Sequence, residues 1–416
     1  MDLRTLPPDI TPHQRCNERR NRIERALGID LAFLTTEEGR IGHAEEKNCE
    51  QMFGTVPVPV GYAGTLSITL SNGEKTTVHL PLATTEGALV ASVNRGCKVL
   101  SEVSGGALTK SIYHGMSRSL VLKPKSKNTQ SYTMAKNVGQ EHSCPTFGKA
   151  IDATFKQWKS IGEATSHHLK ILNYEIDEAD GYTFLTISCD TGEAMGMNMV
   201  TIAAQAIGTW LADELDAEFI TVAGNVDSDK KPSQRTHDRG RGYEVTAEAT
   251  IPASIIETIL KTTPEKLLEV AKAKLEVGSK LAGAIGANLH VANIIAALYL
   301  ATGQDPAHVV EGSMADTTVS GKMKNESGKF EGLSISVHLP AILVGIRGGG
   351  TTLPAQSQCL KLLLGTAEKL SAMRYPLCAP QRLAEIIAAA VLAGELSLLA
   401  AQATGTLAKA HKEMGR

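Results

Sequence analysis

Two glycine-rich segments carry residue types that suit the binding of a phosphate group. Residues 192–199 read GEAMGMNM and lead into an expected helix, and residues 345–354 read GIRGGGTTLP after a strand-like run. Small residues at the start of a helix let backbone N–H groups approach a phosphate, and consecutive glycines leave room for a pyrophosphate. Neither segment has the Gly-x-Gly-x-x-Gly spacing of a Rossmann turn, so core-filling methionines and a flexible turn are the alternatives.

A pair of lysines stands behind two acids and before a proline in residues 227–233, which read DSDKKPS. Pro232 fixes its own φ and pushes the residue before it out of helical geometry. Lys230 and Lys231 are therefore expected on a shaped, extended loop. The alternative is an ordinary solvated turn.

Four further positions could carry chemistry, and each has a structural alternative. Glu86 stands where a strand meets a helix, and the helix dipole alone would favour a carboxylate there. Asp305 precedes a proline and suits a helix cap. Asn293 lies three residues after His290 on an expected apolar helix, where a buried, hydrogen-bonded histidine is common. His411 is close to the C-terminus, where side chains are usually solvated.

The elements that must position these residues change in character along the chain. Helical patterns cover residues 13–28 and 35–53, and alternating apolar residues around a Ser-Asn-Gly turn predict a hairpin over 56–87, followed by a helix over 87–100. Between about 119 and 222, helices alternate with strands, which suits a small α+β unit with an antiparallel sheet. A strand and a series of Ala- and Leu-rich helices follow.

The composition excludes several classes of function. The chain has 416 residues, 42% of them hydrophobic, and a net charge of −2, which gives no electrostatic attraction for nucleic acid or an anionic membrane. Seven cysteines without metal-ligand spacing indicate reduced thiols and a cytoplasmic protein. The longest apolar run, residues 383–405, contains Glu385 and Glu395, so a buried helix is expected and no membrane segment.

Seven segments, taken in chain order, resemble the catalytic portion of the 3-hydroxy-3-methylglutaryl-coenzyme A (HMG-CoA) reductases, in their soluble prokaryotic, class I-like form. They read TTEGALVASVNRGCK, GEAMGMNMV, GNVDSDKKP, NLHVANIIAALYLATGQDP, GIRGGGTTLPAQSQCL, LAGELSLLAAQATG and LAKAHK. The resemblance runs from about residue 15 to the last residue.

The resemblance implies an α+β fold of three parts and a homodimer, with a dimer of dimers as the larger alternative. The parts are a helical N-terminal region, residues 1–49; a large α/β domain for substrate binding and dimerisation, residues 50–118 and 223–416; and an inserted, small ferredoxin-like domain for the nicotinamide cofactor, residues 119–222. Residues 49–61 resemble the dimerisation strand of the family, whose sites form across the dimer interface.

The implied activity is the reduction of HMG-CoA to mevalonate and free coenzyme A with two NADPH, in the mevalonate pathway of isoprenoid synthesis. Lys230 matches the catalytic lysine, whose ammonium stabilises the negative charge that develops on the carbonyl oxygen. Glu86 matches the proton-donating acid, which burial or a second carboxylate must keep protonated. Asp305 matches the aspartate that shares this network, and Asn293 matches the amide that orients the lysine and the glutamate. His411 matches the histidine that protonates the departing thiolate.

The resemblance also implies the binding residues, and no metal among the cofactors. Those for the substrate and coenzyme A are Arg118, Asp229, Lys231, Lys274, Ser92, Asn94 and Arg95. Those for the nicotinamide cofactor are Ser166, His167, Glu193, Met195, Gly196, Met197, Asn198, Gly345, Gly348, Gly349 and Gly350.

Two departures from the family pattern leave alternatives open. His167 stands where the family often has an arginine for the 2′-phosphate of NADPH, so NADH and the oxidative, catabolic direction stay open. Ala223 replaces a serine expected in the substrate pocket. Two alternative functions belong to other classes. One is a cofactor-independent coenzyme A thioester transferase or hydrolase, for which no activated nucleophile is apparent. The other is a non-catalytic binder of coenzyme A ligands.

Overall fold

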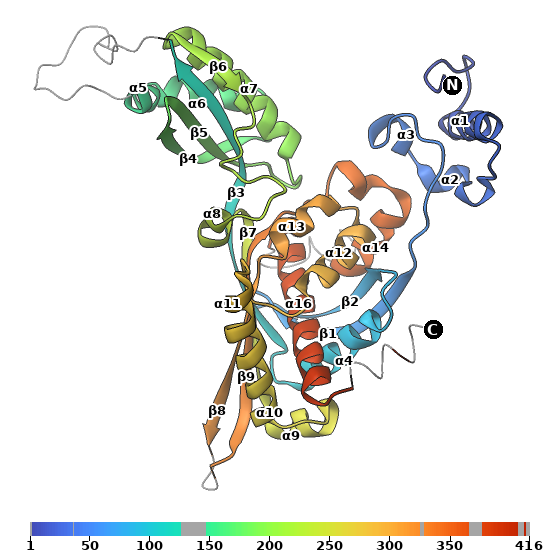
Figure 1. Ribbon diagram of the computed structural model, residues 1–416, viewed down its shortest axis with the longest axis vertical. Coiled ribbons are helices and arrows are strands. Elements are labelled where there is room, and N and C mark those ends of the chain that lie inside the picture. The colour runs from blue at the N-terminus through green and yellow to red at the C-terminus, as the bar shows by residue number, and fades with distance from the viewer. Residues whose placement is uncertain are drawn as a thin grey trace, which may run out of the picture.

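Strand β3 (Ala107–Pro124, 18 residues) belongs to both β-sheets of the protein and connects them. Its first half pairs with β7 (Gly242–Pro252) and its second half with β5 (Tyr182–Asp190) and β6 (Ala217–Thr221). Gly115 lies at the register shift between the halves with a φ of 81°, a conformation that favours glycine. The computed structural model in Figure 1 describes residues 2–35, 37–125, 147–324, 328–365, 377–406 and 412.

The large sheet has the strand order β2-β1-β3-β7-β9-β8. Its first two strands, β1 (Val60–Thr69) and β2 (Lys75–Ala83), form the predicted hairpin, in which Gly73 has the positive φ that the turn requires. Strands β8 (Asp316–Lys324) and β9 (Phe330–Ile342) pair antiparallel at the other side.

Helices cover one face of the large sheet and close its core (Figure 1). The central helix is α16 (Ala379–Ala403), and the others are α4 (Leu89–Glu102), α10 (Pro264–Ala271), α12 (Val291–Thr302) and α14 (Pro354–Leu364). Helix α16 is long and apolar enough to cross a membrane by length and composition alone, but 94% of its most apolar window is buried inside the fold. The sequence-based expectation of a buried helix is confirmed.

The small sheet has the order β4-β5-β3-β6, with β4 spanning Lys170–Ala179. Helices α6 (Phe155–Glu163) and α7 (Met197–Glu214) pack on it around the fully buried Trp158, and α5 (Phe147–Ala153) lies beside them. This sheet and its helices form the upper lobe of Figure 1, separate from the large core. The mixed α and β architecture that the sequence predicts is confirmed.

The N-terminal residues form a third lobe with its own small core. Helix α1 (Pro12–Leu27) confirms the helical pattern over residues 13–28, and it begins with a capping box between Thr11 and Gln14. The helical pattern over residues 35–53 is confirmed only in part, because the described residues of this range contain two short helices, α2 (Glu38–Ile41) and α3 (Ala44–Lys47), and no continuous one. Gly42, with a φ of 50°, ends α2 and separates the two.

The remaining helical segments of the described residues are short. They are η1 (Ala32–Leu34), α8 (Gln234–Arg239), α9 (Ala253–Ile255), η3 (Ile256–Leu260), η4 (Lys272–Gly278), α11 (Ser279–Ala282), η5 (Pro306–His308), α13 (Val309–Gly312) and η6 (Gly349–Thr352). The segments η3 and η4 have π-helical hydrogen bonding. The expectation that His290 and Asn293 share one face of a helix is wrong, because α12 begins at Val291 and His290 occupies its N-cap position.

The closest approach between α4 and α16 depends on a glycine. A Cβ atom on Gly96 would lie 1.9 Å from the carbonyl oxygen of Ala393. We expect Gly96→Ala to force the helices apart and to lower the free energy of unfolding by about 1–3 kcal/mol or more, as overpacked cores do. Chemical denaturation checks this value.

The matched control is Gly39→Ala, because no atom lies within 4 Å of the Cβ position at Gly39. Its free energy of unfolding should change by less than about 1 kcal/mol, the ordinary difference between glycine and alanine in a helix. Equal stability of Gly96→Ala and the parent protein would contradict the close packing of α4 on α16.

Candidate active site

The lysine pair lies in the loop between β6 and α8, in a series of tight turns. Ser228 and Lys230 have left-handed backbone conformations, with φ of 54° and 58°. The N–H of Ser228 donates to Asn225 O at 3.1 Å, and the N–H of Lys231 donates to Ser228 O at the same distance. The loop is therefore shaped, as predicted, but the expectation that it is extended is wrong.

Lys230 forms an ion pair with Asp305, 2.8 Å from Nζ to Oδ2. The side chains are 43% and 32% exposed, so a ligand can reach the pair. Asp305 also caps η5 by accepting a hydrogen bond from the N–H of Ala307 at 3.0 Å, as the sequence predicts. Burial acts to raise the pKa of Asp305, but the hydrogen bonds from Lys230 and Ala307 outweigh it and hold the pKa below its ordinary value.

Two arginines hold the neighbouring aspartates. Arg241 lies 3.0 Å from Asp229 Oδ1, and Arg118 lies 3.5 Å from Asp229 Oδ2 and 3.4 Å from Asp227 Oδ2. Burial would raise the pKa of Asp229, but Arg241 and Arg118 lower it below its ordinary value. For Asp227 burial prevails over the same arginines and raises the pKa.

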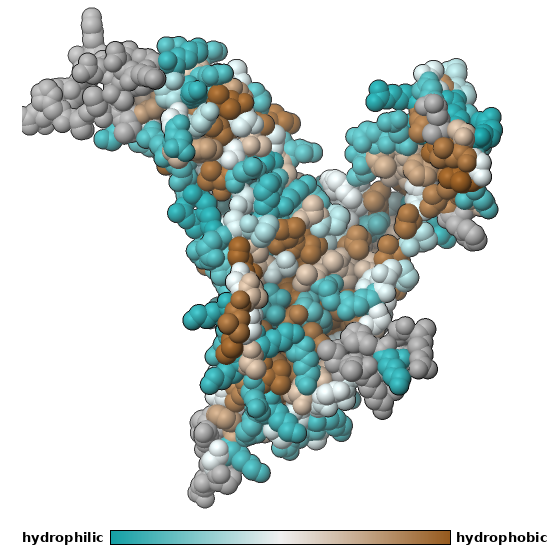
Figure 2. All heavy atoms as spheres, viewed as in Figure 1, coloured by the Kyte–Doolittle hydropathy of each residue, from teal (hydrophilic) through white to brown (hydrophobic). Residues whose placement is uncertain are grey.

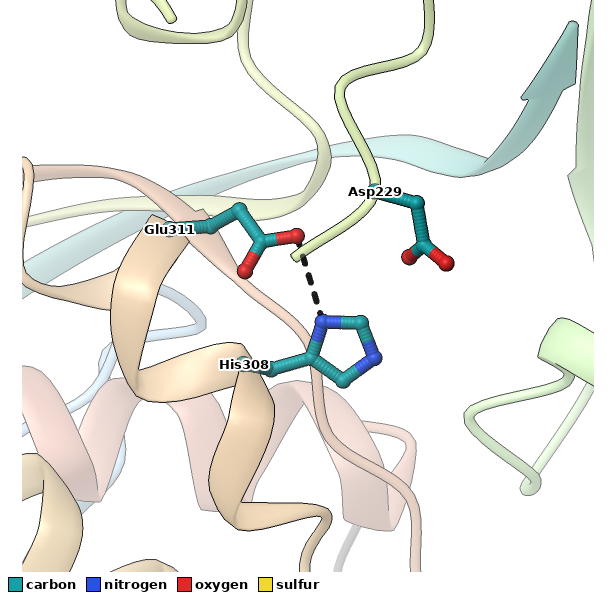
Figure 3. Close-up of side chains that lie close together, drawn as sticks. All are labelled: Asp229, His308 and Glu311. Carbon is teal, nitrogen blue, oxygen red and sulfur yellow. Dashed lines mark hydrogen bonds and ion pairs between the residues drawn. The ribbon is translucent and has the colours of Figure 1, made fainter. Parts of the chain in front are cut away.

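Behind Lys230 lie two fully buried side chains, His308 and Glu311, which Figure 3 shows together with Asp229. Ligand atoms of these three residues lie within 4.8 Å of one another, a spacing that could hold a metal ion. Arg241 Nη1, however, lies 3.0 Å from both Asp229 Oδ1 and Glu311 Oε1. Because a guanidinium already occupies the position between the carboxylates, we assign no metal to this cluster.

Sequence analysis missed three residues of this cluster: Arg241, His308 and Glu311. His308 and Glu311 follow Asp305 by three and six residues, which puts all three on one side of consecutive helical turns, and this spacing could have revealed them. Arg241 stands between two glycines at the start of β7 and has no local signal.

Several predicted site residues form no hydrogen bond or ion pair with Lys230 or Asp305 in the described part of the chain. Glu86 is exposed, and its N–H donates to Thr84 Oγ1 at 3.0 Å, so the burial expected for a proton donor is missing in the single chain. Asn293 bonds through its backbone to His290 O, and Lys274 lies in η4. His411 falls outside the described residues.

The residues predicted near coenzyme A contact other elements. Ser92 Oγ donates to Ser397 Oγ on α16 at 3.1 Å, and Arg95 Nη2 donates to Ser397 O at 2.6 Å. Burial lowers the pKa of Arg95. Asn94 accepts a hydrogen bond from the N–H of Gly64 at 3.0 Å. Lys231 Nζ donates to the carbonyl oxygen of Asp229 at 3.0 Å, within the lysine loop.

The two glycine-rich segments of the sequence lie side by side. The N–H of Ile346 donates to Glu193 O at 2.8 Å, the side chains of Glu193 and Arg347 form an ion pair, and a Cβ on Gly345 would lie 2.3 Å from Met195 N. Gly348 and Gly349 have positive φ and no atom within 4 Å of their Cβ positions.

These segments fit a nicotinamide cofactor, since exposed glycines leave space for a pyrophosphate beside the start of α7. Gly196 is the N-cap of α7, with Met197 and Asn198 in its first turn, and Gly350 packs on Gly303. Ser166 accepts a hydrogen bond from the N–H of His168 at 3.2 Å in the turn before β4, where His167 is exposed.

Solved structures of similar fold come from Streptococcus pneumoniae. An HMG-CoA reductase of that organism has a TM-score of 0.64 and 18% identity, over 92% of this chain and 96% of that one. A class II HMG-CoA reductase from the same organism, bound to NADPH in open conformations, has a TM-score of 0.63. These likenesses show the fold.

Sequence comparison shows the family. The family model described as hydroxymethylglutaryl-coenzyme A reductase matches residues 15–416. The HMG-CoA reductase of Methanothermobacter thermautotrophicus is 38% identical over 400 residues, covering 96% of this chain and 92% of the relative. That of Methanocaldococcus jannaschii is 39% identical over 406 residues, with the same coverage. The chain belongs to the hydroxymethylglutaryl-coenzyme A reductase family.

Proposed function

We propose that the chain reduces HMG-CoA to mevalonate and free coenzyme A with two NADPH, in the biosynthetic direction. The observation that carries this proposal is the Lys230–Asp305 ion pair, in a chain whose relatives are named HMG-CoA reductases. The pneumococcal reductase of similar fold binds NADPH, which would supply hydride when bound beside residues 193–198 and 345–350.

Lys230 is the proposed electrostatic catalyst. Its ammonium would stabilise the negative charge that develops on the carbonyl oxygen of the substrate, and Asp305 holds it in place. Arg118 and Lys231 would bind the substrate carboxylate, with Asp229 positioning both of them. Glu86 and His411 remain the proposed proton donors to the aldehyde oxygen and to the thiolate, and Asn293 and Lys274 the proposed orienting and carboxylate-binding residues.

The proposed domain limits are residues 1–49, 50–118 with 223–416, and 119–222. Their support is the path of the chain, which leaves the large sheet near Gly115 and returns after β6 ends at Thr221. We also propose a cytoplasmic location, which fits six free cysteines among the described residues.

The substrate and cofactor are tested by following reduced cofactor oxidation after HMG-CoA is added. We expect one mevalonate and one free thiol for two NADPH oxidised, and a higher kcat/KM for NADPH than for NADH. A comparable kcat/KM for NADH would favour the NADH alternative, which exposed His167 in place of an arginine keeps open. Thiol release without cofactor oxidation would indicate a hydrolase instead.

The roles of Lys230 and His411 are separated by comparing two substrates, the thioester and the free aldehyde. Lys230→Ala should lower kcat about 100- to 1,000-fold on both, because both reactions develop an oxyanion. His411→Ala should slow the thioester by about 100-fold or more and leave the aldehyde near normal, because only the thioester releases a thiolate. Equal losses on both substrates in His411→Ala would contradict its role.

A homodimer is proposed from an exposed apolar segment. Phe53, Val56, Val58, Val60 and Tyr62 are all exposed, with Val56 at 78%, and Figure 2 shows hydrophobic side chains at the surface of the large and N-terminal lobes. A run of exposed apolar residues that leads into β1 suits burial against a second copy. Sedimentation equilibrium should give twice the chain mass, and Val56→Asp with Val60→Asp should give monomers; a monomeric parent protein would contradict the proposal.

A further inference from the structure

We propose that His308 and Glu311 are positioning residues which fix both the backbone and the ammonium of Lys230 to the turn formed by residues 305–311. The inference rests on the proposed function, in which Lys230 acts on the substrate. It concerns two residues that touch neither substrate nor cofactor and that act only through Lys230 and Asp305.

The first contact holds the backbone of Lys230. Its N–H donates to Glu311 Oε1 at 2.6 Å, and the φ of Lys230 is 58°. A residue with a side chain adopts this left-handed conformation uncommonly, and the contact with Glu311 helps to hold it. Glu311 is fully buried, and its Oε1 also accepts from Arg241 Nη1 at 3.0 Å, so this oxygen is held from two sides.

The second contact connects Glu311 to Asp305 through an imidazole. His308 Nδ1 lies 3.3 Å from Glu311 Oε1, and His308 Nε2 lies 3.8 Å from Asp305 Oδ2. His308 is fully buried, and its Nε2 has no hydrogen-bond partner among the described residues. The unpartnered nitrogen therefore faces the oxygen that binds Lys230 Nζ, and a small approach of Asp305 would complete a hydrogen bond.

These contacts follow a ring, which a small approach of Asp305 to His308 Nε2 across 3.8 Å would close. From the backbone N–H of Lys230 it runs through Glu311, His308 and Asp305 to Nζ of the same lysine. Both ends of one flexible side chain are thereby tied to one short turn, η5 with α13, which limits where the ammonium can lie. A donor fixed before the reaction stabilises charge in the transition state, so loosening the ring should reduce kcat more than substrate binding.

The test compares two substitutions at Glu311 in the full-length protein. Glu311→Gln keeps an oxygen that can accept from the N–H of Lys230, whereas Glu311→Met has a similar shape and no such acceptor. We expect kcat with HMG-CoA and NADPH to fall about 30- to 100-fold in Glu311→Met and less than about 5-fold in Glu311→Gln, with KM for HMG-CoA within about 3-fold in both.

Glu385→Gln is the matched control for loss of a buried carboxylate. Glu385 is also fully buried, and it accepts from Ser71, Thr109 and Ser111, away from the ring. We expect it to lower Tm as Glu311→Met does and to keep kcat within about 2-fold. His308→Leu breaks the ring at another point and should lower kcat about 10-fold at unchanged KM. This second variant tests the proposal if Glu311→Met does not fold.

Full kcat in Glu311→Met or His308→Leu would overturn the positioning role, as would an equal loss of kcat in Glu385→Gln. These outcomes leave the proposed function intact, because the parent protein would still oxidise NADPH with HMG-CoA. A parent protein without that activity would instead overturn the proposed function, and the positioning role with it.

Discussion

One buried guanidinium makes the rest of the site possible. Arg241 is 2% exposed, and its group lies between Asp229 and Glu311, with Asp227 at 3.8 Å. Three carboxylates so close together would repel one another and carry a large desolvation cost without a fixed cation. Arg241 also donates to Ser117 O at 3.1 Å, so its own position depends on β3. Removing its charge would leave the ring around Lys230 without its anchor.

The position of Arg241 explains why the site lies where the two sheets join. Arg241 precedes β7, and its N–H donates to Pro340 O of β9, while Ser117 lies where β3 passes into the small sheet. The side chain of Arg241, which directly precedes a strand of the large sheet, is therefore hydrogen-bonded to Ser117, where the small sheet begins. The loop that carries Lys230 returns from the small sheet to the same place, which brings residues from distant parts of the sequence together.

Local patterns were enough to predict much of this arrangement. The capping of η5 by Asp305, the hairpin of β1 and β2, and the entry into α7 at Gly196 all follow from turn and capping chemistry. The left-handed turn at Lys230 did not follow, because a contact with Glu311, 81 residues away, holds it. Arg241 could not be predicted for the same reason, since its partners come from three separate segments.

Within a single chain, Glu86 lacks the surroundings that its proposed role as a proton donor requires. A carboxylic acid that donates a proton at neutral pH needs burial or a neighbouring carboxylate to stay protonated, yet Glu86 is exposed. Phe53, Val56, Val58, Val60 and Tyr62, in the segment that leads into β1 of the same hairpin and in its first residues, are exposed and apolar as well. One event would account for both observations, because a second copy that covers the apolar segment would also remove water from the end of β2, directly before Glu86. In the proposed homodimer a second copy would complete the surroundings of Glu86, whereas the Lys230–Asp305 pair is already formed within each chain.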